Sequence, residues 1–161
     1  MKRLFFLLPA CFIFAYSCKK DKGKQFPPEP QIYYQSTTPD KVNVRDTASM
    51  TTVVFRFTDG DGDIGQSTSD TVYSIFIRDS RDTTSSDSTY AFPFPYIASE
   101  IRPNGGLEGL VSLNIGRQYY RVWDSLHTAL LKDTMTWSIY IKDEAGNKSN
   151  VITTDTIYVQ Y

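Results

Sequence analysis

The sequence contains almost no cysteine and almost no histidine. Its only cysteines, Cys11 and Cys18, lie within the first 18 of 161 residues. We therefore expect the folded part of the chain to have no disulfide and no thiol nucleophile. His127 is the single histidine. A transition-metal site or a Ser-His-Asp triad is thus not expected, and we interpret His127 as a partly exposed loop residue.

The sequence also lacks an excess of charge of either sign. Lysine and arginine total 17 and the acids total 18, which gives a formal net charge of −1. A strongly basic surface is absent, so a nucleic-acid partner is not expected. Alanine, leucine and glutamate are infrequent, whereas tyrosine, threonine, serine, valine and isoleucine are common. This composition favours strands over helices, and 40% hydrophobic residues suffice for the core of one domain.

The N-terminal residues resemble a secretory signal peptide. A basic start at residues 1–3 is followed by an apolar run over 4–16 that is too short to span a membrane comfortably. The run ends in Ala-Tyr-Ser-Cys, which resembles a bacterial lipobox with Ala15 in place of the usual leucine. We predict lipidation of Cys18. Cys11 also follows a lipobox-like sequence, but cleavage there would leave too short an apolar core. The other alternative is an ordinary signal peptide with an incidental cysteine.

These features divide the chain into three parts. Residues 1–17 are the predicted lipoprotein signal peptide, and residues 18–30 are the lipidated cysteine and a proline-rich flexible tether. Residues 31–161 form the predicted domain. Acyl chains on Cys18 would hold that domain on a membrane.

Short alternating segments separated by turn residues predict an all-β fold. In residues 134–142, for example, apolar side chains alternate regularly with polar ones. About seven such strands, with turns every dozen or so residues, indicate an immunoglobulin-like antiparallel β-sandwich. Residues 79–89 are polar without an apolar anchor, which predicts a mobile loop or a poorly ordered hairpin. Residues 124–131 could form one short helix. The predicted strands are 32–35 with 42–44, 50–58, 71–78, 90–97, 107–115, 134–142 and 151–160.

An acidic loop at the end of the second predicted strand carries the most specific chemistry. Asp59, Asp61 and Asp63 alternate with glycine, and Asp70 stands at the twelfth position of the loop. This spacing resembles a calcium loop of the EF-hand type. However, Ile64 replaces the glycine expected at the sixth position, and a strand rather than a helix precedes the loop. We therefore do not predict an EF-hand fold, but we retain Ca²⁺ binding as a prediction for this loop. The alternative is a solvated Asp-Gly turn without a metal.

The predicted sandwich places a second loop beside the first. If 50–58 and 134–142 are the second and sixth strands, the loops that follow them lie at the same end of the domain. Asp143 and Asn147 would then lie near the acidic loop. We therefore predict a Ca²⁺ site, which joins both loops and is formed by Asp59, Asp61, Asp63, Asp143 and Asn147.

Three motifs together resemble small uncharacterised Bacteroidetes lipoproteins with an immunoglobulin-like domain. They are the relaxed lipobox, the Phe-x-Asp-Gly-Asp-Gly-Asp-Ile-Gly segment over 57–65, and the Lys-Asp-x-Ala-Gly-Asn-Lys-Ser-Asn segment over 142–150. The resemblance implies a fold and a location in the cell envelope, as an outer-membrane lipoprotein facing the periplasm or the cell surface. It implies no enzymatic activity.

The expected function is that of a lipid-anchored, Ca²⁺-stabilised module that is not an enzyme. It would bind a glycan or a partner protein of the envelope, or else act as a structural accessory with no ligand besides the metal. Tyr119, Tyr120 and Trp123 could form an aromatic platform for a sugar, although burial in the core is the favoured alternative. A hydrolase is less expected, because the clustered acids lie in the metal-like loop.

Overall fold

The computed structural model describes residues 26–68, 72–84, 86–102, 106–120 and 132–161. These residues form ten strands and two short 3₁₀ helices, so the predicted all-β class is confirmed. The strands are β1 (Gln31–Thr38), β2 (Lys41–Asn43), β3 (Met50–Asp59), β4 (Tyr73–Asp79), β5 (Tyr90–Pro93), β6 (Leu107–Gly116), β7 (Lys132–Met135), β8 (Trp137–Ile141), β9 (Ile152–Thr153) and β10 (Ile157–Gln160). The 3₁₀ helices are η1 (Ser99–Ile101) and η2 (Arg117–Tyr119).

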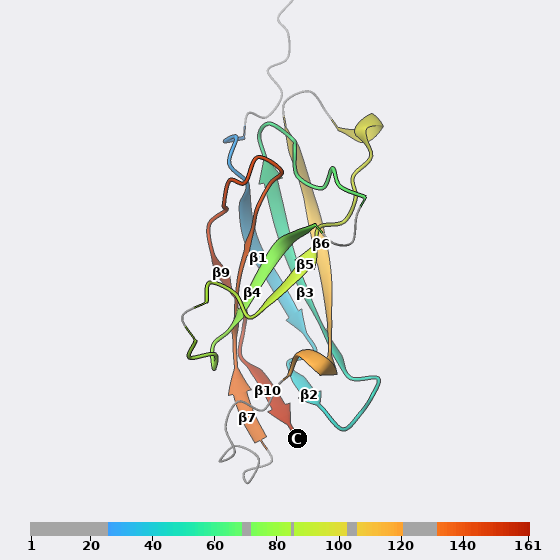
Figure 1. Cartoon of the computed structure of the whole chain (residues 1–161). Helices are drawn as coiled ribbons and strands as arrows, with labels where there is room; N and C mark the ends of the chain where they lie inside the picture. The colour runs from blue at the N-terminus through green and yellow to red at the C-terminus, as the bar shows by residue number, and fades with distance from the viewer. Residues whose placement is uncertain (1–25, 69–71, 85, 103–105, 121–131) are drawn as a thin grey trace, which may run out of the picture.

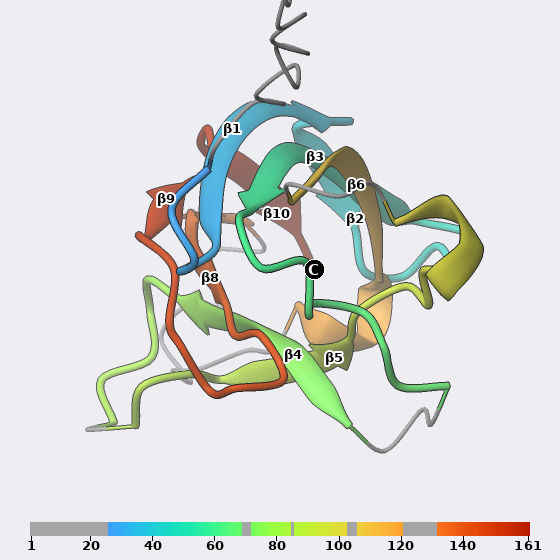
Figure 2. The same ribbon diagram turned by 90° about the horizontal axis from the view of Figure 1, so that it is seen from above.

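The strands form three sheets in the orders β1-β3-β6, β2-β10-β7 and β5-β4-β8-β9. All pairings are antiparallel except that of β2 with β10. Viewed from above, β1, β3 and β6 lie on one side of the molecule, and β4 and β5 on the other (Figure 2). This arrangement encloses the core between the layers.

The segment 134–142, predicted as one strand, is divided in the structure. β7 pairs with β10, whereas β8 pairs with β4 and β9. The break falls at Thr136, whose backbone nitrogen bonds to Ser80 Oγ at 3.0 Å and whose carbonyl accepts the Ser80 N–H at 3.0 Å. Bonding to Ser80 takes Thr136 out of the ladder, so the chain passes from one sheet to another.

The core follows from the alternation of side chains along the strands. On β3, Val53 and Phe55 are fully buried, and Trp137 on β8 is the largest fully buried side chain. The buried apolar residues form one cluster that runs from Ile32 to Tyr161. A chain that starts at residue 19 therefore retains the complete core.

Of the three candidate platform aromatics, Tyr120 is buried and Tyr119 is partly buried. Tyr120 is 4% exposed, and its ring centroid lies 5.2 Å from that of Trp137. Tyr119 packs against Tyr90 and Phe92 at centroid distances of 5.1 and 5.0 Å. The Tyr120 ring is therefore not available to a sugar, and the Tyr119 ring packs against its neighbours instead of standing free as a platform. Trp123, His127 and the helix expected over 124–131 lie outside the described residues.

The polar loop over 79–89 packs on the domain through charges rather than apolar contacts. Arg81, on this loop, forms ion pairs with Asp79 at 2.7 Å and Asp133 at 2.9 Å. It also donates to the Tyr161 hydroxyl at 2.6 Å. Asp82 accepts hydrogen bonds from Thr89 Oγ1 and from a backbone amide. The sequence interpretation considered only apolar anchors and so missed these polar contacts; the flanking strands β4 and β5 pair as a hairpin.

Candidate metal centre

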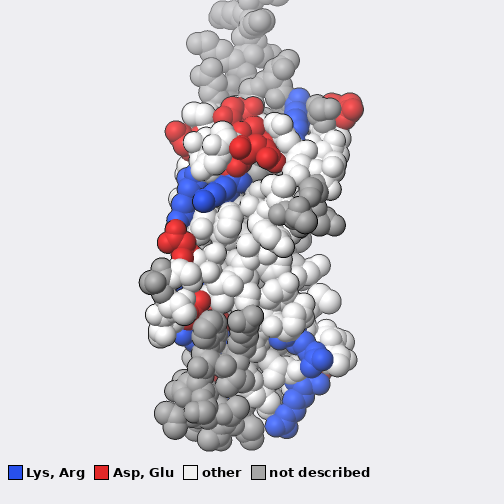
Figure 3. Space-filling model, in the orientation of Figure 1, with Lys and Arg blue, Asp and Glu red and all other residues white. Residues whose placement is uncertain are grey.

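Two loops bring four carboxylates together at one end of the molecule. Asp59 ends β3, Asp61 and Asp63 follow it, and Asp143 follows β8. One oxygen from each of the four lies within 4.8 Å of the others. The loops lie at the same end of the ribbon in Figure 1, where Figure 3 shows acidic side chains gathered on the surface. Asp61 is exposed, so the cluster opens to solvent.

Two of these carboxylates each have one satisfied and one unsatisfied oxygen. The backbone N–H of Ile64 donates to Asp59 Oδ2 at 3.0 Å, and that of Ala145 donates to Asp63 Oδ2 at 3.0 Å. The Oδ1 atoms of Asp59 and Asp63 are buried without a hydrogen-bond partner among the described residues. Buried polar atoms are rarely left unpaired, and a cation between these oxygens would pair both.

The sequence of the acidic loop explains its shape. Gly62 and Gly65 adopt φ values of 72° and 68°, a left-handed conformation that other residues rarely adopt. Ile64, which departs from the EF-hand pattern, is fully buried and fixes the loop to the core. Arg102 braces the same loop, because its guanidinium donates to the carbonyls of Gly62 and Ile64.

Asn147 contacts Asp143 and is not one of the four clustered carboxylates. Its backbone N–H donates to Asp143 Oδ1 at 2.7 Å, and its Nδ2 donates to Asp143 Oδ2 at 2.9 Å. These two hydrogen bonds fix the orientation of the Asp143 carboxylate, and the residue is 6% exposed. The structure brings four of the five predicted ligands together. The fifth, Asn147, contacts Asp143 and orients its carboxylate. Asp70 lies outside the described residues.

The electrostatics of the cluster disfavour four bare negative charges. Burial, together with the neighbouring Asp61 and Asp63, raises the pKa of Asp59 to about 7. Burial also raises the pKa of Asp63, and Asp143 and Asp61 add to the effect. Without a cation the cluster therefore retains protons well above the usual range of a carboxyl group. A bound divalent cation would reverse this preference.

The donor set identifies the class of metal that would fit. All four candidate ligands are carboxylates, the hard oxygen donors that Ca²⁺ prefers, and no nitrogen or sulfur ligand belongs to the described cluster. Ca²⁺ takes six to eight oxygens. One oxygen from each of four carboxylates would leave room for water on the side of the exposed Asp61.

Comparisons of the chain with protein families, with curated proteins and with solved structures found no match. Within the described part of the chain, no helix is long and apolar enough to cross a membrane. The interpretation of the site therefore depends on its own geometry.

Sequence reasoning did not find Arg102, which follows η1 and lies 38 positions from Ile64. We predict that Arg102→Ala weakens Ca²⁺ binding by roughly tenfold, because outer contacts that position ligands commonly have effects of this size. Arg78→Ala is the matched control, since Arg78 braces another loop through the carbonyls of Asp82 and Thr84. Calorimetric titration measures both; equal affinities in the two variants would contradict the prediction.

Proposed function

We propose that this protein is a non-catalytic, Ca²⁺-binding β-sandwich module, held on the cell envelope by a lipid on Cys18. The observation that carries the proposal is the pair of buried, unpaired oxygens of Asp59 and Asp63 within a cluster of four carboxylates. The metal would join the loop after β3 to the loop after β8 and so stabilise this end of the domain.

The order of the strands supports an immunoglobulin-like arrangement. β7 and β8 are separated only by Thr136, and β9 and β10 by residues 154–156. If these pairs and the β1–β2 pair are each counted as one strand, seven strands remain. The layers β1-β3-β6 and β5-β4-β8-β9 then resemble the two sheets of such a sandwich, except that β5 pairs with β4 rather than with β6. In this arrangement the loops after β3 and β8 share one end.

The course of the N-terminal segment supports an orientation relative to the membrane. The carbonyl oxygens of Phe26 and Pro27 pack so closely on Gly60 that a Cβ there would lie 2.3 Å from each. The chain thus enters the domain at the metal end (Figure 1). About eight residue steps separate Cys18 from Phe26, a reach of at most about 29 Å. The metal end would then face the membrane, and β2, β7 and β10 would lie far from it.

We predict that lipidation depends on Cys18 and not on Cys11. Cys18→Ser should move the protein from the membrane fraction to the soluble fraction, because no acyl chain would remain to hold it. Cys11→Ser is the matched control and should leave the protein in the membrane fraction. Intact-mass measurement of detergent-extracted protein should show the acyl groups. A soluble wild type of unmodified mass would contradict the anchor.

Two roles remain for the anchored module: binding a glycan or envelope protein, or acting as a structural accessory without a further ligand. The binding role is favoured by a groove of about 760 Å³ at the end opposite to the metal centre.

A further inference from the structure

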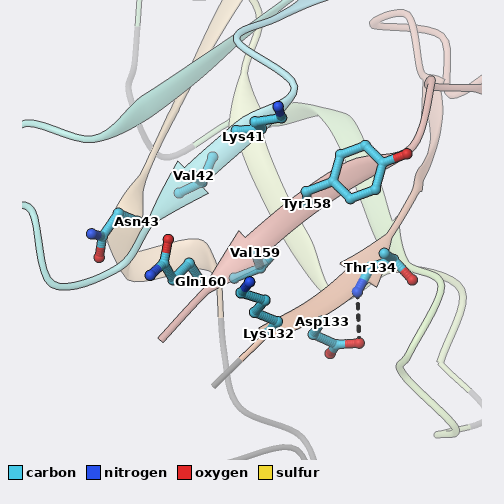
Figure 4. A pocket seen from close by; sticks show the side chains of 9 residues that line it. All are labelled: Lys41, Val42, Asn43, Lys132, Asp133, Thr134, Tyr158, Val159 and Gln160. Carbon is cyan, nitrogen blue, oxygen red and sulfur yellow. Dashed lines mark hydrogen bonds between the residues drawn. The ribbon is translucent and has the colours of Figure 1, made fainter. Parts of the chain in front are cut away.

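The groove lies on the outer face of the β2-β10-β7 sheet. The registers of these strands align two rows of exposed residues on that face: Lys41, Tyr158 and Thr134 in one row, and Asn43, Gln160 and Lys132 in the other. Val42 and Val159, between the rows, are buried and belong to the core. Figure 4 shows the six polar and aromatic side chains around the groove.

The chemistry of this face is that of a carbohydrate site. Tyr158 is 50% exposed, so its ring presents a flat apolar surface to solvent, as required for stacking against a sugar ring. The side-chain amides of Asn43 and Gln160 lie in the neighbouring row and offer both donors and acceptors to sugar hydroxyls. Two rows on three strands cover an area of about 7 by 10 Å, which suits one or two sugar units.

The charge of the face selects among sugars. Lys41 and Lys132 stand at diagonal corners, and no acid is among the six outward-facing residues. Asp133 lines the groove, but its carboxylate is 11% exposed and pairs with Arg81. Neither lysine forms an ion pair within the described part of the chain. Two unpaired ammonium groups beside an exposed ring complement a carboxylate-bearing sugar.

We propose that this groove binds acidic glycans that contain uronic acids. The Tyr158 ring stacks on a sugar ring, the amides of Asn43 and Gln160 bond to its hydroxyls, and Lys41 and Lys132 bind carboxylates. This proposal rests on the proposed function, because it names the ligand of the anchored module. In the orientation argued above, the groove faces away from the membrane, where an external polysaccharide can reach it.

The test uses the chain from residue 19, which retains the complete core. Titration calorimetry in about 0.15 M NaCl compares oligogalacturonate, oligoalginate and hyaluronan oligosaccharides with their carboxyl-reduced counterparts. We expect at least one uronate series to bind with a Kd of about 0.1 mM, and its reduced counterpart to bind about tenfold more weakly. Binding should weaken as salt is raised.

Variants assign the binding to the groove. Tyr158→Ala should weaken binding by tenfold or more, and Lys41→Gln with Lys132→Gln should weaken it similarly and remove most of its salt dependence. Tyr33→Ala is the matched control, because Tyr33 is 45% exposed on a different sheet. If Tyr158→Ala does not fold, the lysine variants still test whether uronates bind in the groove. Absence of binding by every uronate series, a preference for the neutral sugars, or unchanged binding in the groove variants would overturn the proposal.

Uronate titrations in EDTA and a separate Ca²⁺ titration without glycan distinguish this proposal from the proposed function, because free Ca²⁺ itself binds uronate carboxylates. The groove and the metal centre lie at opposite ends (Figure 1), so uronates should bind in EDTA, where the metal centre is empty. If uronates bind but Ca²⁺ neither binds nor raises the melting temperature, the metal centre alone is wrong. If Ca²⁺ binds and no uronate does, the groove proposal alone is wrong.

Discussion

Asp59→Asn is expected to raise the melting temperature of the Ca²⁺-free protein and to abolish most of its stabilisation by Ca²⁺. The Asp59 carboxyl is fully buried beside three other carboxyl groups, and its pKa is raised from 3.8 to about 7. An asparagine Oδ1 retains the bond from the Ile64 N–H, and its amide hydrogens can bond to a neighbouring carboxylate. The neutral side chain should stabilise the Ca²⁺-free fold by about 1–3 kcal/mol near pH 8.

The pH dependence provides a second readout of the same prediction. The folded protein binds the Asp59 proton more tightly than the unfolded chain does. The resulting stabilisation is complete below the unfolded pKa of 3.8 and is lost as the pH rises to about 7. In EDTA, the wild type should therefore melt higher at pH 5 than at pH 8, and Asp59→Asn should show a smaller difference.

The control for this prediction is Asp40→Asn, because Asp40 is exposed and lies near β2, away from the cluster. It should change neither the melting temperature in EDTA nor the response to Ca²⁺. Thermal melts of the wild type and both variants, in EDTA and in 10 mM Ca²⁺, make the comparison. If Ca²⁺-free Asp59→Asn melted at a lower temperature than the wild type, burial and the neighbouring carboxylates would not destabilise the ionised Asp59 side chain, and the prediction would be contradicted.

Arg81→Met is expected to destabilise the protein by about 3–5 kcal/mol, because it removes a largely buried guanidinium that pairs with two buried carboxylates. The Asp79 side chain is fully buried and that of Asp133 is 11% exposed, and both lose the guanidinium that pairs them. The hydroxyl of Tyr161 loses a bond as well.

Arg56→Met is the matched control. Arg56 pairs with Glu108 at 2.6 Å, but the side chains are 37% and 31% exposed. Exposed pairs of this kind contribute at most about 1 kcal/mol. Urea unfolding followed by tryptophan fluorescence gives both free energies. Equal losses in the two variants would mean that the Arg81 contacts do not anchor the loop.

Part of this architecture could be predicted from the sequence because it depends on local periodicity. The alternation over 50–58 corresponds to β3, and the predicted strand over 90–97 corresponds to β5, whose Pro93 lacks a backbone donor and so suits the edge position that β5 occupies. The meeting of Asp143 with the acidic loop followed from the predicted topology, since the loops after the second and sixth strands of such a sandwich lie at the same end. Residue spacing alone would not have joined positions 80 apart.

The features that sequence reasoning missed depend on contacts between distant residues. The exchange of hydrogen bonds between Thr136 and Ser80 divides a segment whose periodicity is uninterrupted. Arg81 meets Asp133 and Arg102 meets Ile64 only after the strands have assembled. Nothing in the residues around these arginines distinguishes them from solvent-exposed ones.

Titration calorimetry of the chain from residue 19 with Ca²⁺ tests the central claim most directly. We predict a single site with a Kd of about 10⁻⁴ to 10⁻³ M, the range of extracellular calcium modules. At 100 times Kd this binding would stabilise the fold by about 2.7 kcal/mol and raise the melting temperature by roughly 10 °C. No heat of binding and no change in melting temperature at millimolar Ca²⁺ would contradict the assignment of Asp59, Asp61, Asp63 and Asp143 as a calcium centre.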